Sequence, residues 1–264
     1  DQAGKKRKSE TDALGRLTKV WEPNVSGSYV NESLYQYDVL DNLTRVDQKG
    51  NDTNSANWRT RTFAYNSLSQ LTTATNPESG TVSYAYDNDG NLTSKGDARA
   101  ITTWFSYDAL HRLLSKTYSD GTSAVGYEYD TVVWGYETNV VGRLARLQYT
   151  AASGSGEGFG YDSMGRLIRH DRGVDGQWTG VEYTYNLGGA TTEINYMNSG
   201  RRVAYTYNAA GRTTQVRETT GALKVYADNF LYHPHGAWKE MKLQNGGLKQ
   251  SATYNNRLQP SVLS

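Results

Sequence analysis

The sequence predicts an all-β protein in which tandem β-hairpins form one continuous, strongly curled or spiralling antiparallel sheet. Three observations support this fold class. A short phrase with two aromatic residues and an Asp recurs along the chain, and its internal spacing is that of a strand, a tight turn and a second strand. The composition of 27 Gly, 21 Tyr and 4 Pro favours many turns between half-buried strands. A recurrence every ~20 to 50 residues is typical of repeat architectures.

The clearest copy of the phrase is FSYDALHRLLSK at residues 105–116, and ten further copies surround it. Their second aromatic position, or its equivalent, falls at Thr11, Tyr37, Tyr65, Tyr86, Tyr107, Tyr129, Tyr161, Tyr185, Tyr207, Tyr232 and Tyr254. Sheets of more than about ten strands curl. We therefore expect residues 1–264 to form a single array of about eleven hairpin units.

Each part of the phrase has a structural reason. Aromatic residues two positions apart, such as Phe105 and Tyr107, share one face of a strand. The following D-x-x-G matches a type I turn, in which Asp accepts backbone hydrogen bonds and the fourth residue takes a positive φ. Such a turn leads into a β-bulge that twists the hairpin.

The fourth turn position tests this interpretation. Six copies have Gly there, at 15, 90, 165, 189, 211 and 236. Asp41 and His111 are of residue types that tolerate positive φ, whereas Ser69 is the least suitable occupant. Other copies replace the turn Asp by Asn or by His233, and we expect these to have looser turns.

The turn also fixes the register, because the residue before Asp then faces the residue five after it. Such pairs of an aromatic and an aliphatic residue stabilise a sheet. The expected pairs are Tyr37 with Leu43, Tyr86 with Leu92, Tyr107 with Leu113 and Tyr161 with Leu167. The residues predicted to carry the structural motif are Tyr37, Asp38, Tyr86, Asp87, Gly90, Tyr107, Asp108, Leu113, Tyr161, Asp162, Gly165, Arg166 and Leu167.

The phrase Y-x-Y-D-x-x-G-R-L, intact as YDSMGRL at 161–167, resembles the YD repeat of RHS proteins, the rearrangement-hotspot and teneurin-like polypeptides. The resemblance implies a spiralling β-sheet wound into a hollow shell that encloses a C-terminal toxin. On this basis residues 1–264 are a wall segment of a larger bacterial polypeptide, secreted or displayed at the cell surface. Its expected partners are the remainder of that polypeptide and the enclosed domain. The D-P-x-G-like signature that accompanies self-cleavage in the family does not occur in this sequence.

The sequence offers little for catalysis or for cofactors. With no Cys, it has no disulfides, Cys-ligated zinc sites or thiol nucleophiles. His233 and His235 flank a proline in a turn, and no pattern supplies a third metal ligand. The run Asp87–Asn91 lacks the Glu that closes an EF-hand loop and fits the repeat instead. We therefore expect no catalytic residue, metal site or cofactor.

Charge and hydropathy exclude two further classes of partner. A net charge of +1 argues against nucleic acid, which requires a concentrated positive surface. No apolar run reaches the ~18 residues needed to cross a bilayer, so we expect no membrane insertion. Neither end of the sequence resembles the polar cap of a repeat array, which is consistent with a fragment of a longer chain.

Two stretches interrupt the repeat and are the candidates for specific binding. Residues 50–60 form a polar connection that ends near Trp58, and residues 131–141 insert Trp134 and Tyr136 between the Asp and Gly of one hairpin. Loops on a rigid scaffold often bind ligands, and exposed rings can stack on sugars. The alternative function is therefore an extracellular module that binds carbohydrate or a cell-surface partner. The opposing interpretation is that these aromatic side chains cover an uneven hairpin.

A more remote alternative is an enzyme that acts on polysaccharide. It requires convergent acids or bases. The sequence shows no paired carboxylates apart from the turn aspartates.

Overall fold

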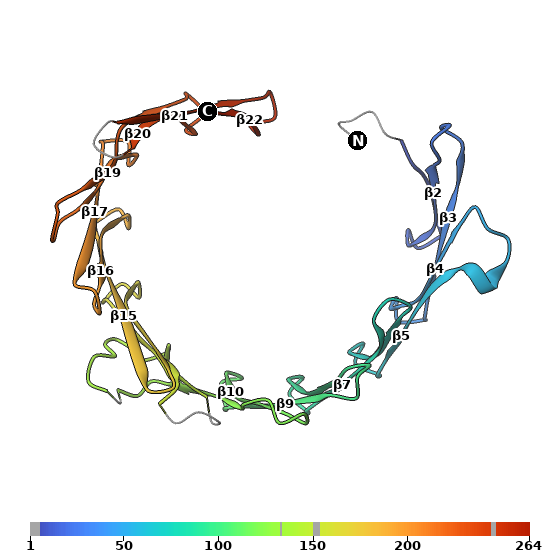
Figure 1. Ribbon diagram of the computed structural model, residues 1–264. Helices are drawn as coiled ribbons and strands as arrows, with labels where there is room; N and C mark the ends of the chain where they lie inside the picture. Colours follow the sequence, from blue (N-terminus) through green and yellow to red (C-terminus); the bar gives the residue numbers. More distant parts are fainter. Residues whose placement is uncertain (1–5, 133, 150–153, 244–246) are drawn as a thin grey trace. The chain divides into compact units, whose positions relative to one another are not determined.

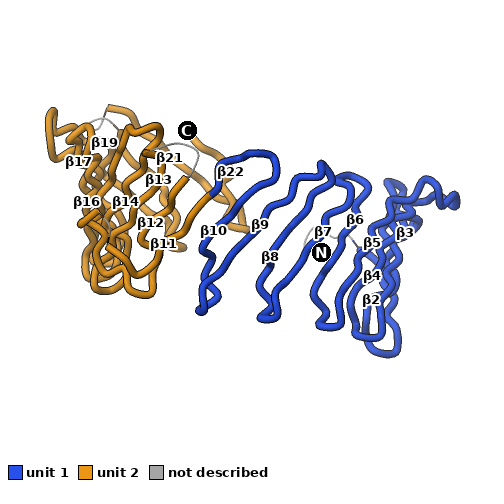
Figure 2. Tube along the Cα trace, turned by 90° about the horizontal axis from the view of Figure 1, so that it is seen from below, with its two compact units in different colours: residues 1–124 blue, residues 125–264 orange. Residues whose placement is uncertain are grey.

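The computed structural model describes residues 6–132, 134–149, 154–243 and 247–264. These residues contain 22 β-strands and one short 3-10 helix, and the chain divides into two compact units, residues 1–124 and 125–264. Figure 2 colours the two units separately. The all-β, antiparallel fold predicted from the sequence is confirmed.

Unit 1 is an antiparallel meander in which each strand pairs with the next one along the chain. Within this unit the strands follow a curved path from β2 to β10 (Figure 1). The 3-10 helix η1 (Ser55–Asn57) lies in the connection between β4 and β5. The strands are β1 (Lys8–Thr11), β2 (Leu17–Pro23), β3 (Tyr29–Tyr37), β4 (Leu43–Gly50), β5 (Arg59–Tyr65), β6 (Leu71–Asn76), β7 (Gly80–Tyr86), β8 (Leu92–Gly96), β9 (Thr102–Tyr107) and β10 (Leu113–Tyr118).

Unit 2 continues the same pattern with twelve strands, again paired in sequence order. The strands are β11 (Val125–Tyr129), β12 (Leu144–Tyr149), β13 (Gly156–Tyr161), β14 (Leu167–Val174), β15 (Gln177–Tyr185), β16 (Thr191–Tyr196), β17 (Arg201–Tyr207), β18 (Thr213–Glu218), β19 (Val225–Tyr232), β20 (Trp238–Leu243), β21 (Leu248–Tyr254) and β22 (Pro260–Leu263).

The hairpins have the register that the sequence predicts. Tyr86 pairs with Leu92, and the ladder then skips one residue so that Ala85 faces Ser94, which is the expected bulge. Tyr37, Tyr107 and Tyr161 likewise pair with Leu43, Leu113 and Leu167. Positive φ at the fourth turn position is also confirmed, with 65° at Asp41, 58° at Ser69 and 60° at His111.

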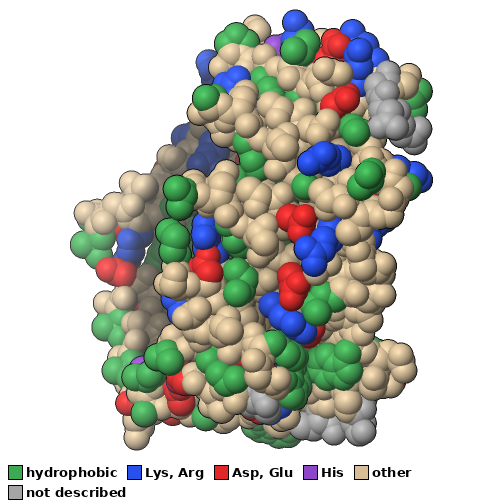
Figure 3. Space-filling view, turned by 90° about the vertical axis from the view of Figure 1, so that its left-hand side faces the viewer, with side chains coloured by type: hydrophobic (Ala, Val, Ile, Leu, Met, Phe, Trp, Pro, Cys, Tyr) green, Lys and Arg blue, Asp and Glu red, His purple; other side chains and the backbone are tan. Residues whose placement is uncertain are grey.

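Each unit is a single layer of strands with a thin core. The buried apolar side chains among the described residues are small: Val20, Ala74, Val140, Ala145, Val203, Ala227 and Ala252. On the face drawn in Figure 3, acidic and basic side chains lie beside one another among uncharged ones. Because little apolar surface is buried centrally, each unit is held together mainly by contacts between neighbouring hairpins. Among the described residues, no helix has the length and apolar character to span a bilayer.

Candidate functional site

The repeated turns share one hydrogen-bonded cap. In the turn after β9, Asp108 Oδ1 accepts from the backbone N–H groups of Leu110 and Arg112, each at 2.9 Å, and His111 N–H donates to the Asp108 carbonyl at 3.0 Å. The hydrogen bonds from the Arg112 backbone and side chain outweigh burial and lower the pKa of Asp108. Asp38, Asp87 and Asp162 accept the corresponding pair of backbone bonds. The turn therefore uses a side-chain oxygen at this position as an acceptor.

Replacing the turn Asp by Asn does not loosen the turn, contrary to the expectation from sequence. Asn66 Oδ1 accepts from Leu68 and Gln70 at 3.0 Å, and Asn208 and Asn255 cap their turns in the same way. An amide oxygen replaces a carboxylate oxygen at no geometric cost. His233 differs, because its Nε2 lies 3.2 Å from the Ala252 carbonyl oxygen and its ring stacks on His235.

Eight of the tyrosines that precede a turn Asp, or its Asn or His replacement, reach back to the preceding hairpin. Tyr86 Oη donates to the Leu71 carbonyl at 2.9 Å, and Tyr107 Oη donates to the Leu92 carbonyl at 3.0 Å. The same bond recurs in both units, from Tyr65 to Leu43, Tyr161 to Leu144, Tyr185 to Leu167, Tyr207 to Thr191, Tyr232 to Thr213 and Tyr254 to Trp238. We call these bonds the tyrosine clips. Each clip fastens one hairpin to the last strand of the hairpin before it.

The arginine of the phrase reaches forward to the next hairpin. Arg166 Nε donates to Asp162 Oδ2 at 2.6 Å, its Nη1 donates to the Asn186 carbonyl at 3.0 Å, and its guanidinium lies 4.8 Å from the Tyr185 ring centroid. Arg16 makes the equivalent contacts with Asp12, Asp38 and Tyr37. Within each unit, Tyr, Asp, Arg and Leu of one copy therefore contact both of its neighbours.

Residues 131–142 pack on the sheet of unit 2. Residue 133 lies outside the described residues. The loop residues that lie against β13, where Gly158 and Gly160 leave room for them, are Trp134, Tyr136, Thr138 and Asn139. A Cβ atom added at Gly158 would lie 2.8 Å from Trp134 and 3.0 Å from the Tyr136 hydroxyl, and one at Gly160 would lie 2.9 Å from the Tyr136 carbonyl. The sequence G-E-G-F-G of β13 thus places three glycines on one face, and the loop covers this face at Gly158 and Gly160.

Polar contacts fix this loop in place. Tyr161 N–H donates to the Thr138 carbonyl at 2.9 Å, while Thr138 Oγ1 and Asn139 Nδ2 donate to the Tyr161 carbonyl at 2.8 Å. Glu137 is 1% exposed and accepts from the Trp134 backbone N–H. The described residues Thr138 and Asn139 of the loop are therefore hydrogen-bonded to the end of β13.

The two candidate binding aromatics of this loop lie together. Trp134 and Tyr136 have ring centroids 5.7 Å apart, and Trp178 of β15 meets Trp134 edge-on at 4.9 Å. An arginine lies over each of these two rings. The Arg146 guanidinium is 4.8 Å from the Trp134 ring centroid, and the Arg169 guanidinium is 4.2 Å from the Tyr136 ring centroid. With Asp171, these rings line a shallow hollow of about 350 Å³.

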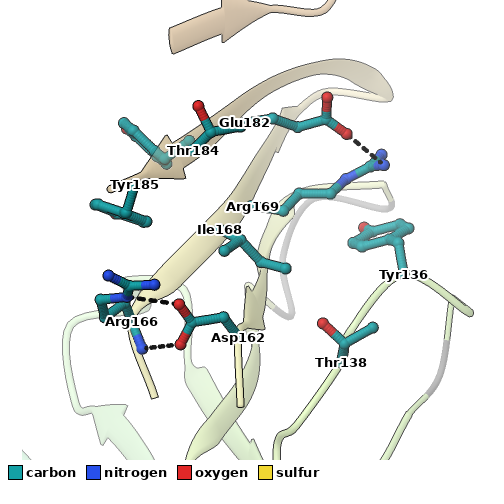
Figure 4. Close-up of a pocket in the computed structure, with 10 residues that line it drawn as sticks. Tyr136, Thr138, Asp162, Arg166, Ile168, Arg169, Glu182, Thr184 and Tyr185 are labelled. Carbon is teal, nitrogen blue, oxygen red and sulfur yellow. Dashed lines mark hydrogen bonds and ion pairs between the residues drawn. The ribbon is translucent and has the colours of Figure 1, made fainter. Parts of the chain in front are cut away.

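A second hollow lies beside the loop and is drawn in Figure 4. Tyr136 and Thr138 line one side of it, and residues of β14, β15 and the turn before β14 line the other. Its charged groups are already paired, Arg166 with Asp162 at 2.6 Å and Arg169 with Glu182 at 3.4 Å. Burial, followed by the charges of Asp171 and Glu137, raises the pKa of Tyr136 far above its usual value, so its hydroxyl stays protonated.

Trp58, the third candidate, lies in unit 1 and is half-buried. Its Nε1 donates to the Asp52 carbonyl at 2.9 Å, and Lys49 Nζ lies 4.6 Å from its ring centroid. The Trp58 ring thus closes the loop formed by residues 50–58.

One titratable cluster was not anticipated from the sequence. Glu157 accepts from Tyr149 Oη at 2.8 Å and lies 2.9 Å from His170 Nε2, whose ring stacks on Phe159. Burial opposes ionisation of Glu157, but the bonds from Tyr149 and His170 prevail and lower its pKa. No group of three or more potential metal ligands occurs among the described residues.

Comparison with known proteins agrees with this geometry. Residues 65–103 and 86–123 match the family described as RHS Repeat. No curated protein sequence matches the chain.

Solved structures extend the likeness to most of the chain. A TcdB2-TccC3 crystal structure is similar with a TM-score of 0.79 and 12% identity over 96% of this chain and 14% of that chain. A Photorhabdus luminescens Tc holotoxin pore with a mutated TccC3 is similar with a TM-score of 0.78 and 13% identity, over 97% of this chain and 14% of that chain. TcdB2-TccC3 without its hypervariable C-terminal region is similar with a TM-score of 0.78 and 13% identity, over 94% of this chain and 13% of that chain. Residues 65–123 are therefore similar to RHS repeats, and the fold of the chain is the one found in these TcdB2-TccC3 structures.

Proposed function

We propose that residues 1–264 form one stretch of wall in an RHS shell, a β-sheet cocoon that encloses a C-terminal toxin or effector of a larger secreted or surface-displayed polypeptide. The observation that carries the proposal is the set of tyrosine clips, which fasten consecutive hairpins within both units. Such coupling makes a continuous, closely linked sheet. The chain covers only 14% of the length of the similar TcdB2-TccC3 chain, which fits a segment of a longer array.

In this role the chain contributes a surface and no catalysis of its own. Its turn aspartates are used in turn caps and ion pairs, such as Asp108 with Arg112 and Asp162 with Arg166. The partners of the wall are then the remaining repeats of the polypeptide and the enclosed domain.

The test begins with the parent polypeptide purified from its native source. Intact mass and a peptide map should reveal many further repeats and a C-terminal domain. Limited proteolysis should cleave that domain only after the shell is opened by denaturant. A polypeptide without further repeats, or a C-terminal domain digested as fast as the free domain, contradicts the proposal.

The hollow lined by Trp134, Tyr136 and Trp178 favours glycan binding as a second candidate function. Calorimetric titration with oligosaccharides should then show saturable binding that Trp134→Ala abolishes. Trp58→Ala tests the loop of unit 1 in the same way. A lack of saturable binding by the unaltered chain rules the candidate out.

A further inference from the structure

The indole ring of Trp178 lies flat on the sheet of unit 2. Trp178 pairs with Gly173 across β14 and β15, and a Cβ atom added at Gly173 would lie 2.5 Å from Cε2 of the ring and 2.7 Å from Cδ2 and Cζ2. Nearly equal distances to three ring atoms place the glycine under the face of the ring and not at its edge. Trp178 is half-buried, so the strand covers one face of the ring and the other face lines the hollow of about 350 Å³, the first hollow.

Trp134 stands beside this ring as a wall. Its ring plane is inclined by 74° to that of Trp178, with the ring centroids 4.9 Å apart, so the two indoles form a corner with a floor and a wall. Both carboxylate oxygens of Glu137 accept from the Trp134 backbone N–H, at 2.9 and 3.1 Å. The Arg146 guanidinium lies 4.8 Å from the Trp134 ring centroid and supports the wall.

The support of this wall leaves one polar group unsatisfied. Arg146 is 9% exposed, and its Nε has no hydrogen-bond partner in the part of the chain that the structure describes. A buried N–H group without an acceptor costs free energy of folding. The Trp134 ring that it supports is still 37% exposed, so this cost is not recovered by burying the ring. A locally unfavourable arrangement beside an exposed ring is typical of a binding site and not of a packed core.

An ion pair forms the polar side of the first hollow. Arg169 donates to Asp171 at 2.7 and 3.2 Å and to Glu182 at 3.4 Å, which uses three of the five N–H groups of the guanidinium. Arg169 and Asp171 are the charged residues that line this hollow, so their charges balance. A cationic ligand would meet Arg169, and an anionic ligand would meet Asp171. The first hollow therefore suits a neutral ligand that both donates and accepts hydrogen bonds.

The second hollow, of about 510 Å³, adjoins the first. The two share Tyr136 and Arg169, whose guanidinium lies 4.2 Å from the Tyr136 ring centroid. In Figure 4 the Arg169 guanidinium lies between Tyr136 and Glu182. Thr138 and Thr184 also line the second hollow. A ligand that occupies both hollows crosses the Tyr136–Arg169 stack.

These features are complementary to a neutral oligosaccharide. A pyranose ring has an apolar C–H face that stacks on an aromatic ring, and its hydroxyls each donate and accept hydrogen bonds. We propose that unit 2 binds a neutral oligosaccharide of at least two sugar units, with the first unit stacked on Trp178 beside Trp134. Its hydroxyls bond to the Arg169–Asp171 pair, and the next unit crosses Tyr136 into the second hollow. This inference rests on the second candidate function, glycan binding, and adds to it the charge and the length of the ligand.

The first test is an array of oligosaccharides of one to five units with neutral, uronate-containing, sialylated and amine-bearing members, followed by calorimetric titration of those that bind. Neutral members should bind, and the dissociation constant should fall about tenfold or more from the monosaccharide to the trisaccharide of the same sugar. If no member binds, the candidate function fails and the inference fails with it. If acidic or amine-bearing members bind best, or if affinity does not depend on length, glycan binding stands and the inference is overturned.

Two pairs of variants test the two hollows. Trp178→Ala should weaken binding of neutral oligosaccharides about tenfold or more, whereas Trp104→Ala, which removes a 47% exposed tryptophan of unit 1, should not. Thr184→Tyr should fill the second hollow and reduce the affinity for the trisaccharide to that for the monosaccharide. Its matched control is Thr206→Tyr in the next hairpin, because Thr184 and Thr206 each pair through Oγ1 with a threonine of the following strand at 2.8 Å.

Folding is checked by far-UV circular dichroism and by the unfolding midpoint. Thr184 and Thr206 are both exposed, so their variants should match the unaltered chain, and Thr184→Tyr carries the test if Trp178→Ala alters the fold. Equal effects of Thr184→Tyr and Thr206→Tyr on trisaccharide binding overturn the proposal. So does a folded Trp178→Ala variant that binds neutral oligosaccharides as the unaltered chain does.

Discussion

Tyr86→Phe removes one tyrosine clip and leaves the aromatic ring in place. The lost bond runs from Tyr86 Oη to the Leu71 carbonyl over 2.9 Å and joins β7 to β6. A neutral hydrogen bond of this kind contributes about 0.5 to 1.5 kcal/mol net. We expect the free energy of unfolding to fall by about 1 kcal/mol, with a decrease of about 3 °C in the midpoint of thermal unfolding.

Tyr84→Phe is the matched control for this variant. Tyr84 lies two residues earlier in β7, is also half-buried, and its hydroxyl has no hydrogen-bond partner among the described residues. Urea unfolding followed by circular dichroism should separate the two variants, with Tyr84→Phe within about 0.3 kcal/mol of the unaltered chain. Amide exchange should accelerate around β6 and β7 only for Tyr86→Phe. Equal losses for both variants, or no loss for Tyr86→Phe, would refute the clip as a coupling element.

Three other changes test the turn and the loop. Ser69→Gly should raise the free energy of unfolding by about 0.5 to 1 kcal/mol in urea titrations, because Ser69 has a φ of 58° that Gly adopts without strain. The lowered pKa of Asp108 means that its contribution is complete above the unfolded value and is lost as pH falls through the folded one. Asp108→Asn keeps the turn and should therefore flatten the acid side of the pH–stability profile, measured as the urea midpoint. Gly158→Ala places a Cβ 2.8 Å from Trp134 and should speed proteolysis of residues 131–142, whereas Gly126→Ala, whose Cβ meets only Gln148 at 3.8 Å, should not.

The hairpins could be predicted because their determinants are local. The turn Asp, the positive-φ residue and the Tyr–Leu pair all lie within seven consecutive residues, as at 86–92. The thin core and the continuation of the meander follow from stacking such units. The division into two compact units, at residues 124 and 125, has no marker in the repeat.

The tyrosine clips were missed although the sequence carries a signal for them. The first aromatic position is Tyr, Phe or, in the last copy, Ala252, whereas the second is Tyr in every copy from Tyr37 onward. A strand face that needs only an apolar ring accepts Phe, so invariant Tyr indicates a hydroxyl with a partner. That partner lies in the preceding hairpin, 15 to 22 residues earlier, which local turn rules do not reach.

The sequence also contains a pattern that indicates where Trp134 and Tyr136 pack. Residues 154–160 read GSGEGFG, and glycines at every second position of a strand leave one face without side chains. A neighbouring loop rich in aromatic residues is the natural cover for such a face. The interpretation that these aromatics cover an uneven hairpin matches their contacts with Gly158.

The long insertion in the turn between β11 and β12 shows why a clipped array can carry additional loops. Gly142 follows Asp130 by twelve positions instead of three, yet Gly142 N–H still donates to Asp130 Oδ1. Beyond the insertion, Tyr161 Oη still donates to the Leu144 carbonyl at 2.9 Å, and Arg143 lies 5.7 Å from the Tyr161 ring centroid. Coupling between hairpins runs through the residues at the base of each turn and not through its tip. The tips can therefore change in length and character, with a loop at one and a leucine at another, while the bonds that join one hairpin to the next are kept.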